Sequence, residues 1–325
     1  MDELRVTFEA AKLLQFEKFM SSYSLQTVLD TNINRYEYLG SSINRSCRFC
    51  GKSRPEVSFK KEAHVIPQSI GNRYLLSYFE CDSCNHFFGT TYDDSFANFF
   101  SDSRAMAAIK SQTTGKSIKH KESNTGFQIG HNGFNVQITY DGKHPEVFNL
   151  DLEKKELTLL ITLPTHVPIF VFKAMMKIAL CMIGEDERQQ FANCFRWLLT
   201  CSKDGLFKDS DMLKMIVTSV PGQPLWTSPL AFLYTSKDLT SNRNHPQKIF
   251  ILYFFNRFYQ IMLPLNEKDK ELVGRKSEHF ILPALLDTTY TASVGFPYTF
   301  EMNMSSNEKL KGSQVKRTMT FQDLQ

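Results

Sequence analysis

Hydrophobic and polar positions change their period along this chain, and the change separates its two ends. Near the N-terminus, apolar residues recur at helical spacing from Leu4 to Phe19, which predicts one or two amphipathic helices within residues 1–40. Further along, apolar and polar residues alternate over residues 126–140 and 147–164, as in strands that are half buried. The pattern therefore predicts a helical start followed by a region built on a sheet.

The C-terminal half combines two helices with more strands. Residues 167–184 and 185–201 have helical spacing, and a polar, basic tail is expected after residue 304. The further predicted strands cover residues 212–220, 224–234, 248–265 (interrupted at Asn256-Arg257) and 292–304. We interpret residues 122–325 as an α+β domain, an antiparallel sheet with a helical pair packed on it.

Composition excludes several classes of protein. With 325 residues and 42% of them hydrophobic, the chain can bury a sizeable core, so a largely disordered protein is excluded. The two most apolar segments contain Lys173, Lys177 and Arg257, so neither offers the ~20 uncharged residues of a membrane span. The N-terminus has no basic start followed by an apolar stretch, unlike a secretory signal. We expect a soluble, cytoplasmic protein with no membrane partner.

The net charge of +4 is too small to identify a partner, but its distribution is informative. Residues 45–62 carry Arg45, Arg48, Lys52, Arg54, Lys60 and Lys61 against Glu56 and Glu62, and a second basic cluster comprises Lys110, Lys116, Lys119 and Lys121. Such clusters suit a phosphate backbone. Charge alone, however, favours the simpler interpretation of two solvated loops.

Four of the seven cysteines form two pairs, Cys47/Cys50 and Cys81/Cys84, each with two residues between its members. Without a secretory signal disulfides are not expected, and two such pairs predict a tetrahedral zinc site. No βαβ pattern surrounds the pairs, which argues against a thioredoxin-like redox role. The other three cysteines lie in apolar helical patterns and are expected in the core: Cys181, Cys194 and Cys201.

The segment between the two cysteine pairs contains a histidine in a defined setting. Residues 57–66 can be extended, Pro67 ends this strand, and Gly71 favours a loop. His64 therefore lies at the end of a strand, inside the unit that zinc would hold together. After the second pair, Phe96, Phe99 and Phe100 stand at helical spacing and predict a helix.

These motifs, CRFC, AHVIPQSIG and CDSCN followed by FG, resemble an HNH endonuclease. More narrowly they resemble the bacterial four-cysteine HNH subfamily, whose pattern is C-x-x-C, H-x-x-P-x-x-x-G and C-x-x-C-N. The resemblance covers about residues 45–100 and implies a ββα-metal finger that cleaves nucleic acid with the help of a metal ion. The fold class expected for the chain is α+β: N-terminal helices, a zinc-stapled ββα-metal HNH finger, and the C-terminal antiparallel-sheet domain.

The resemblance also implies roles for individual residues. His64 would be the general base, Asn85 would face a catalytic Mg²⁺ or Mn²⁺ ion, and the structural zinc would be bound by Cys47, Cys50, Cys81 and Cys84. The family usually has an acidic residue directly before the catalytic histidine, but here that position is Ala63 and the carboxylate is Glu62. Because residues i and i+2 of a strand share a face, Glu62 could join the metal site, although a solvated charge is an equally good interpretation.

A second departure concerns the middle asparagine of the family. Residues 74–80 contain no asparagine, and Asn72 is the nearest candidate. Asp93, Asp94 or His86 could complete the metal shell, although a surface or helix-start role is the commoner one for each.

We expect three regions: a helical segment at 1–40, the HNH nuclease domain at 41–112, and the α+β domain at 122–325. The function expected from the resemblance is hydrolysis of DNA (RNA not excluded), in restriction or defence against foreign DNA. The third region could grip DNA, form a homodimer or sense a small-molecule signal. The alternative is an inactive zinc-stapled nucleic-acid-binding or adaptor protein, which Ala63 and the missing asparagine would favour.

Overall fold

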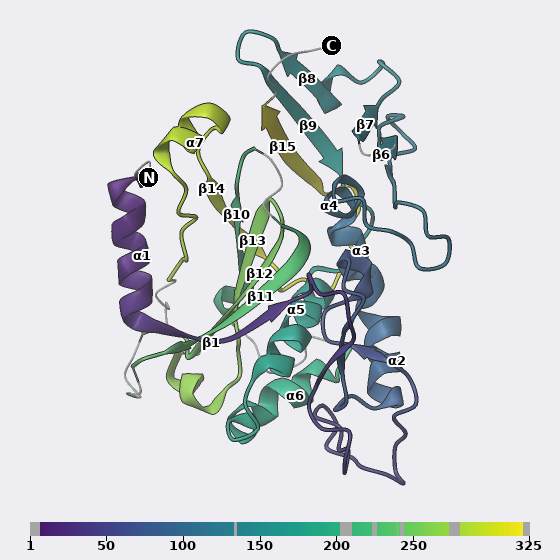
Figure 1. The fold of residues 1–325 in the computed structure, drawn as a ribbon, viewed down its shortest axis with the longest axis vertical. Helices are drawn as coiled ribbons and strands as arrows, with labels where there is room; N and C mark the ends of the chain where they lie inside the picture. The colour runs from purple at the N-terminus through teal and green to yellow at the C-terminus, as the bar shows by residue number, and fades with distance from the viewer. Residues whose placement is uncertain are drawn as a thin grey trace.

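The computed structural model describes residues 7–132, 135–201, 210–222, 226–238, 240, 244–272 and 280–320. Its centre is a sheet of six antiparallel strands in the order β1-β11-β12-β13-β10-β14 (Figure 1). These strands are β1 (Tyr23–Asp30), β10 (Lys214–Ser219), β11 (Trp226–Ser236), β12 (Lys248–Phe255), β13 (Arg257–Met262) and β14 (Tyr298–Asn303). The expected α+β class with an antiparallel sheet is confirmed.

Both faces of the central sheet are covered. On β12, Phe250 and Leu252 pack into the core that contains helices α5 (Pro168–Met182) and α6 (Ala192–Leu198). The alternate residues Ile249 and Ile251 pack against helix α1 (Ala10–Ser22). Since successive side chains of a strand point to opposite faces, burial on both faces explains why this segment is apolar without alternation.

The candidate finger is built from short elements beside this sheet. Strands β2 (Glu37–Leu39), β4 (Leu75–Ser77) and β3 (Ala63–His64) form a small sheet in the order β2-β4-β3. It is followed by helices α2 (Asp82–Thr91), α3 (Asp93–Phe99) and α4 (Ser101–Met106). Because β3, β4 and α2 follow one another along the chain, they form the expected ββα order.

Two smaller sheets lie at the end of the molecule that holds the C-terminus (Figure 1). Two three-stranded sheets have the orders β15-β9-β8 and β5-β6-β7. Their strands are β5 (His120–Lys121), β6 (Gln128–Asn132), β7 (Asn135–Thr139), β8 (Phe148–Asp151), β9 (Glu156–Thr162) and β15 (Gln314–Thr320). The other helices are α7 (Thr288–Val294) and the 3-10 turns Gln68–Ile70, Pro145–Val147, Arg188–Phe191, Ser210–Leu213 and Glu267–Leu272.

One hydrophobic core joins the finger to the central sheet. Phe100, at the junction of α3 and α4, contacts Phe254 and Tyr259, with ring centroids 5.9 and 4.8 Å away. Helix α3 also packs along α5. The position of the finger is therefore fixed by buried aromatic contacts with strands that lie far away in the sequence.

Three local predictions differ from the structure. Residues 23–30 form an edge strand, not a helix; Leu25 and Val28 are exposed there, so apolar residues occur on both faces and obscure the period of two. Helix α2 begins at Asp82, earlier than the phenylalanine spacing indicated. Residues 314–320 pair with β9 instead of forming a polar tail. Among the described residues, no helix is both long and apolar enough to cross a membrane.

A buried ion pair holds the C-terminal strand to the finger's last helix. The Arg317 Nε atom donates to an oxygen of Asp102 at 2.6 Å, and both side chains are buried. Burial raises the pKa of Asp102, but the charges of Arg317 and Arg257 and the hydrogen bonds from Arg317 and the Ser103 amide together lower it by more, so its pKa lies below its ordinary value.

We expect Arg317→Met to destabilise the protein, because it leaves the Asp102 carboxylate buried without its main partner. The free energy of unfolding should fall by ~3 kcal/mol, toward the lower end for broken buried pairs because Arg257 still attracts the carboxylate. Urea titration followed by circular dichroism measures it. The exposed neighbour Lys316→Met should change stability by less than ~0.5 kcal/mol; equal effects of the two changes would show that the ion pair contributes nothing.

Candidate active site

Four cysteine sulfurs gather where the two loops of the finger meet. Cys81 is the N-cap of α2, Cys84 lies in its first turn, and Cys47 and Cys50 lie on the opposing loop. All four sulfurs lie within 4.8 Å of one another, and those of Cys50 and Cys81 are 3.8 Å apart. A tetrahedron with Zn–S bonds of ~2.3 Å has edges of about 3.8 Å, so the arrangement fits a structural zinc ion.

The electrostatics of these thiols also suit a bound cation. A hydrogen bond from the Cys84 thiol lowers the pKa of Cys47 to about 5, whereas burial raises the pKa of Cys81 to about 11. The pKa of Cys84 is raised too, chiefly because its proton is held by Cys47. Without a cation the cluster therefore favours one thiolate. A divalent ion would stabilise all four.

Local hydrogen bonds shape the finger around the cysteines. The Gly51 amide donates to the Cys47 carbonyl at 2.8 Å, and Gly51 has a φ of 76°, a conformation that glycine adopts without strain. Across the site, the Asp82 carboxylate accepts from the amides of Lys60 and Lys61 at 2.9 and 2.8 Å. The segment leading into β3 is thus tied to the start of α2.

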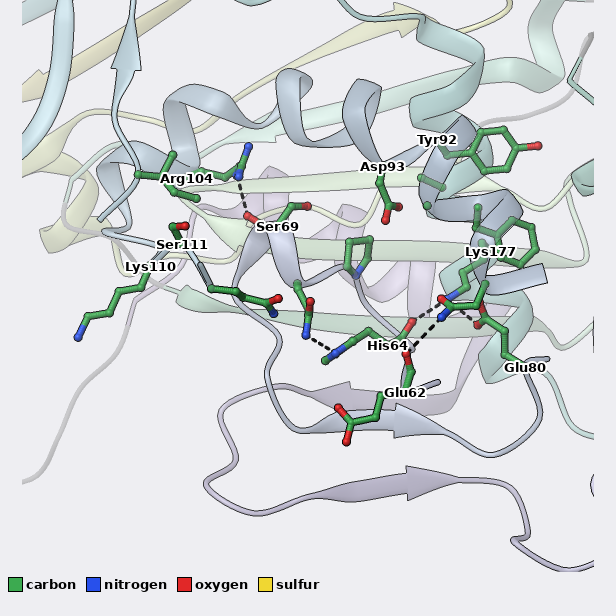
Figure 2. A pocket seen from close by; sticks show the side chains of 18 residues that line it. Glu62, His64, Ser69, Glu80, Tyr92, Asp93, Arg104, Lys110, Ser111 and Lys177 are labelled. Atoms are coloured by element: carbon green, nitrogen blue, oxygen red, sulfur yellow. Dashed lines mark hydrogen bonds and ion pairs between the residues drawn. The ribbon is translucent and has the colours of Figure 1, made fainter. Parts of the chain in front are cut away.

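A cavity of about 600 Å³ opens between β3, α2, α3 and α5 (Figure 2). His64 enters it from the end of β3, and Asn85 lines it from the first turns of α2. Its other polar lining residues are Glu62, Gln68, Ser69, Glu80, Tyr92, Asp93, Arg104, Lys110, Ser111, Gln112 and Lys177. The sequence-predicted residues His64, Glu62 and Asn85 therefore share one cavity.

The His64 imidazole is half buried and electrically neutral at pH 7. Burial, together with the positive charge of Lys177, lowers the pKa of His64 to about 4. The Gln68 side-chain amide makes a short contact with Nε2, while Nδ1 is buried and has no hydrogen-bond partner among the described residues. The ring is held through one nitrogen, and the other nitrogen lacks a partner.

The remaining predicted residues differ in position. The Asn85 amide donates to the backbone carbonyl of Glu62 at 3.3 Å, which joins α2 to the strand before His64. Asp93 lines the cavity, but Asp94 and His86 do not. Asn72 is buried, and its amide donates to the carbonyls of Ile66 and Leu75 at 2.7 and 2.9 Å, so it holds the loop after β3 in place.

Residues 47–101 match the HNH endonuclease family. This match confirms the resemblance seen in the motifs, and the clustered sulfurs agree with the four-cysteine form. No match was found among curated proteins or among solved structures.

The cavity that contains His64 also receives a side chain from outside residues 47–101. Lys177 of α5 donates to the His64 carbonyl at 2.6 Å and pairs with Glu80 at 2.9 Å (Figure 2). Burial lowers the pKa of Lys177, but Glu80, Cys181 and Asp93 together raise it by more, so the net shift is upward and the ammonium stays charged at pH 7. Burial raises the pKa of Glu80, and Lys177 offsets only part of this.

Sequence reasoning did not find Lys177, Glu80 or Gln68 as site residues. One signal was present, because Lys173 and Lys177 stand four residues apart in an otherwise apolar helix. Charges on a buried helix need partners, so a partner for each was to be expected. Lys173 donates to the carbonyls of Trp197 and Thr200, whereas Lys177 lines the cavity that contains His64.

We expect Cys81→Ser to lower zinc content and stability together. Serine can still cap the start of α2, as the Cys81 sulfur does, so a loss of stability would report the missing metal ligand and not the missing cap. Zinc per chain, measured by atomic absorption after gel filtration, should fall well below that of the wild type. Cys201, which was expected in the core, is exposed instead, and it offers a control: Cys201→Ser should keep its zinc. Unchanged zinc in Cys81→Ser would exclude the four-thiolate site.

We expect Lys177→Met to lower the free energy of unfolding by ~3–5 kcal/mol, because Glu80 would stay buried without its cation. Replacing both partners, as Lys177→Met with Glu80→Leu, should recover most of that loss. A guanidinium titration of the two single variants and the double variant forms a thermodynamic cycle. Additive losses in the cycle would show that the two side chains do not stabilise each other.

Proposed function

We propose that this chain is a metal-dependent endonuclease that hydrolyses DNA phosphodiester bonds, with His64 as the general base. The observation that carries the proposal is a neutral, half-buried His64 in a cavity of about 600 Å³, beside Asn85 and inside the HNH segment. A cavity with a few convergent polar groups and a histidine of perturbed pKa is the usual setting of a reaction site.

The state of His64 suits proton transfer. A base must be unprotonated, and a pKa of about 4 keeps the imidazole neutral at pH 7. The Gln68 side-chain N–H donates to Nε2, so Nε2 carries the lone pair, and Gln68 has to release this hydrogen bond before Nε2 can take the proton of the attacking water. A bound phosphate would raise the pKa of His64 toward neutrality, because negative charge favours the imidazolium, and the ring would then be a stronger base.

The proposed reaction balances with one water molecule. The water oxygen forms a bond to phosphorus in line with the departing 3′ oxygen, and the water proton passes to His64. The bond between phosphorus and the 3′ oxygen breaks, and that oxygen takes up a proton. The products carry a 5′-phosphate and a 3′-hydroxyl. Lys177, through the His64 carbonyl, keeps β3 and its imidazole in place during this step.

Oxygen donors suited to a catalytic metal ion line the same cavity. Glu62, Asn85 and Asp93 could hold Mg²⁺ or Mn²⁺, which prefer oxygen ligands and retain several waters. When bound, such an ion offsets the negative charge that develops on the phosphate and on the leaving oxygen. Outside the four cysteines, no three His, Cys, Asp or Glu side chains converge in the described parts of the chain. Waters and phosphate oxygens would therefore supply most of the coordination.

This sparse metal shell is the specific observation that favours the alternative, an inactive zinc-stapled binding or adaptor protein. DNA as the substrate is supported by the exposed Lys110, which lines the cavity and could contact a phosphate. A role in restriction or defence, and RNA as a further substrate, are extensions of the proposal.

We expect the purified protein to nick or cut plasmid DNA with Mg²⁺ or Mn²⁺ and to lose this activity in EDTA. His64→Ala should slow cleavage by ~10²–10⁴-fold, as expected for loss of a general base. Gel electrophoresis of plasmid over time measures the rate. Zinc content and melting temperature should stay at wild-type values.

His144→Ala is a matched control, because His144 lies in a turn outside the cavity; it should cut normally. Cleavage by His64→Ala at the wild-type rate would refute the assignment of the base. If the wild type binds DNA but makes no breaks with either metal ion, the inactive binding protein is the correct interpretation.

A further inference from the structure

Four tyrosines, of which Tyr36 and Tyr38 are exposed and Tyr74 and Tyr78 half buried, form an aromatic surface on the small sheet that carries His64. Tyr36 directly precedes β2 and Tyr38 lies on it, while Tyr74 and Tyr78 stand at the two ends of β4. We call these four residues the tyrosine platform. The exposed fraction is 57% for Tyr36 and 39% for Tyr38. The rings of Tyr38 and Tyr78 are stacked, with centroids 4.3 Å apart and planes within 8°, and Tyr36 meets Tyr74 edge-on at 5.4 Å.

The strand register places this platform on the same face as the catalytic histidine. Tyr38 pairs with Leu76, and Leu76 pairs with His64. Residues that pair across adjacent strands project to the same face, so these three side chains form one row, in which Leu76 is fully buried between Tyr38 and His64. The opposite face is the core side, because it carries Leu75 and Leu39. Two strand spacings of ~4.8 Å separate Tyr38 from His64, about 10 Å in all.

Glu62 lies between the platform and the cavity. It is two residues from His64 and lines the cavity, and its charge is close enough to affect the Tyr38 hydroxyl. Partial burial is the first cause of the raised pKa of Tyr38, and Tyr78 and then Glu62 add to it. The platform and the cavity are therefore neighbouring parts of one surface.

Arginine side chains lie beside the platform. The Arg45 guanidinium lies over the Tyr78 ring, 5.1 Å from its centroid, and its Nε donates to the Tyr78 carbonyl at 2.6 Å. Arg54 lies close enough to Arg45 to lower its pKa, after the larger effect of burial. On β2, Glu37 is paired with Arg35. Cations around exposed aromatic rings suit a ligand that has both phosphates and flat bases.

We propose that the tyrosine platform stacks unpaired nucleobases of the strand whose phosphate is bound at His64. This inference rests on the proposed function and specifies its substrate: a nucleic acid with a single-stranded stretch beside the cleaved bond. Bases inside a duplex are stacked on each other and cannot reach the tyrosine rings, whereas unpaired bases can. A protein partner on this face would not explain why the rings adjoin the phosphate-cleaving cavity.

The test uses the full chain carrying His64→Ala, so that binding is measured without cleavage. Three labelled DNAs are compared by fluorescence anisotropy: a single strand, a duplex, and a duplex with a single-stranded tail. Adding Tyr36→Ala and Tyr38→Ala should weaken binding of the single strand and the tailed duplex by about tenfold or more, and of the blunt duplex by less than twofold. A 2-aminopurine in the single strand should be quenched by the parent protein and not by the double alanine variant.

Two controls separate stacking from structure. Tyr38→Phe keeps the ring and should keep both affinity and quenching. Tyr298→Ala removes a tyrosine of similar exposure (42%) on β14 and should change neither. Melting curves of all variants identify any that fail to fold, and in that case Tyr38→Trp, read by quenching of its own fluorescence, replaces the alanine change.

The outcomes distinguish this inference from the proposed function. Equal binding by the parent and the alanine variants would overturn the platform, even if the wild type cuts DNA. Self-association that is lost on Tyr→Ala, with unchanged DNA binding, would also overturn it, because the face would then be a contact between copies. Tyrosine-dependent binding by a wild type that never cuts would support the platform and refute the nuclease.

Discussion

The buried ammonium of Lys177 links helix α5 to the finger, directly beside the candidate active site. It is supplied by α5, which packs on the central sheet, and it donates to the backbone of the strand end that carries His64. Its partner Glu80 belongs to the finger and is itself buried. A charge pair of this kind tolerates little displacement, because an unpaired buried ion is costly. The orientation of the imidazole therefore depends on the larger region as well as on the cysteine staple.

Much of the finger could be predicted from the sequence, because its signals are local. The spacing within each cysteine pair predicts the zinc site, and Pro67 and Gly71 predict the loop after His64. The structure brings the four sulfurs together. Apart from β1, the strands of the central sheet could also be predicted, since runs such as residues 248–262 are apolar enough to be buried on both faces. The roles of His64, Glu62 and Asn85, and the division at residues 41–112, stay predictions.

The rest depended on contacts between distant residues. The pairing of β1 with β11 joins segments about 200 residues apart, and the pairing of β15 with β9 hides Arg317 in an interior where its sequence neighbours suggest solvent. Whether a lysine in an apolar helix faces a partner carbonyl or a reaction site depends on what packs against that helix. No single-sequence pattern contains this information, because periodicity reports the buried face and not its neighbour.

The continuous core has a consequence for how such a chain can evolve. Phe96, Phe99 and Phe100 of the finger pack into the same hydrophobic cluster as the residues of α5 and the central strands. An excised finger would expose this aromatic surface to water and leave Glu80 without its counter-ion. The segment is therefore unsuited to transfer as a portable cassette between unrelated hosts. Recombination that conserves it would have to carry α5 along, or re-create an apolar surface with a cation at the same place.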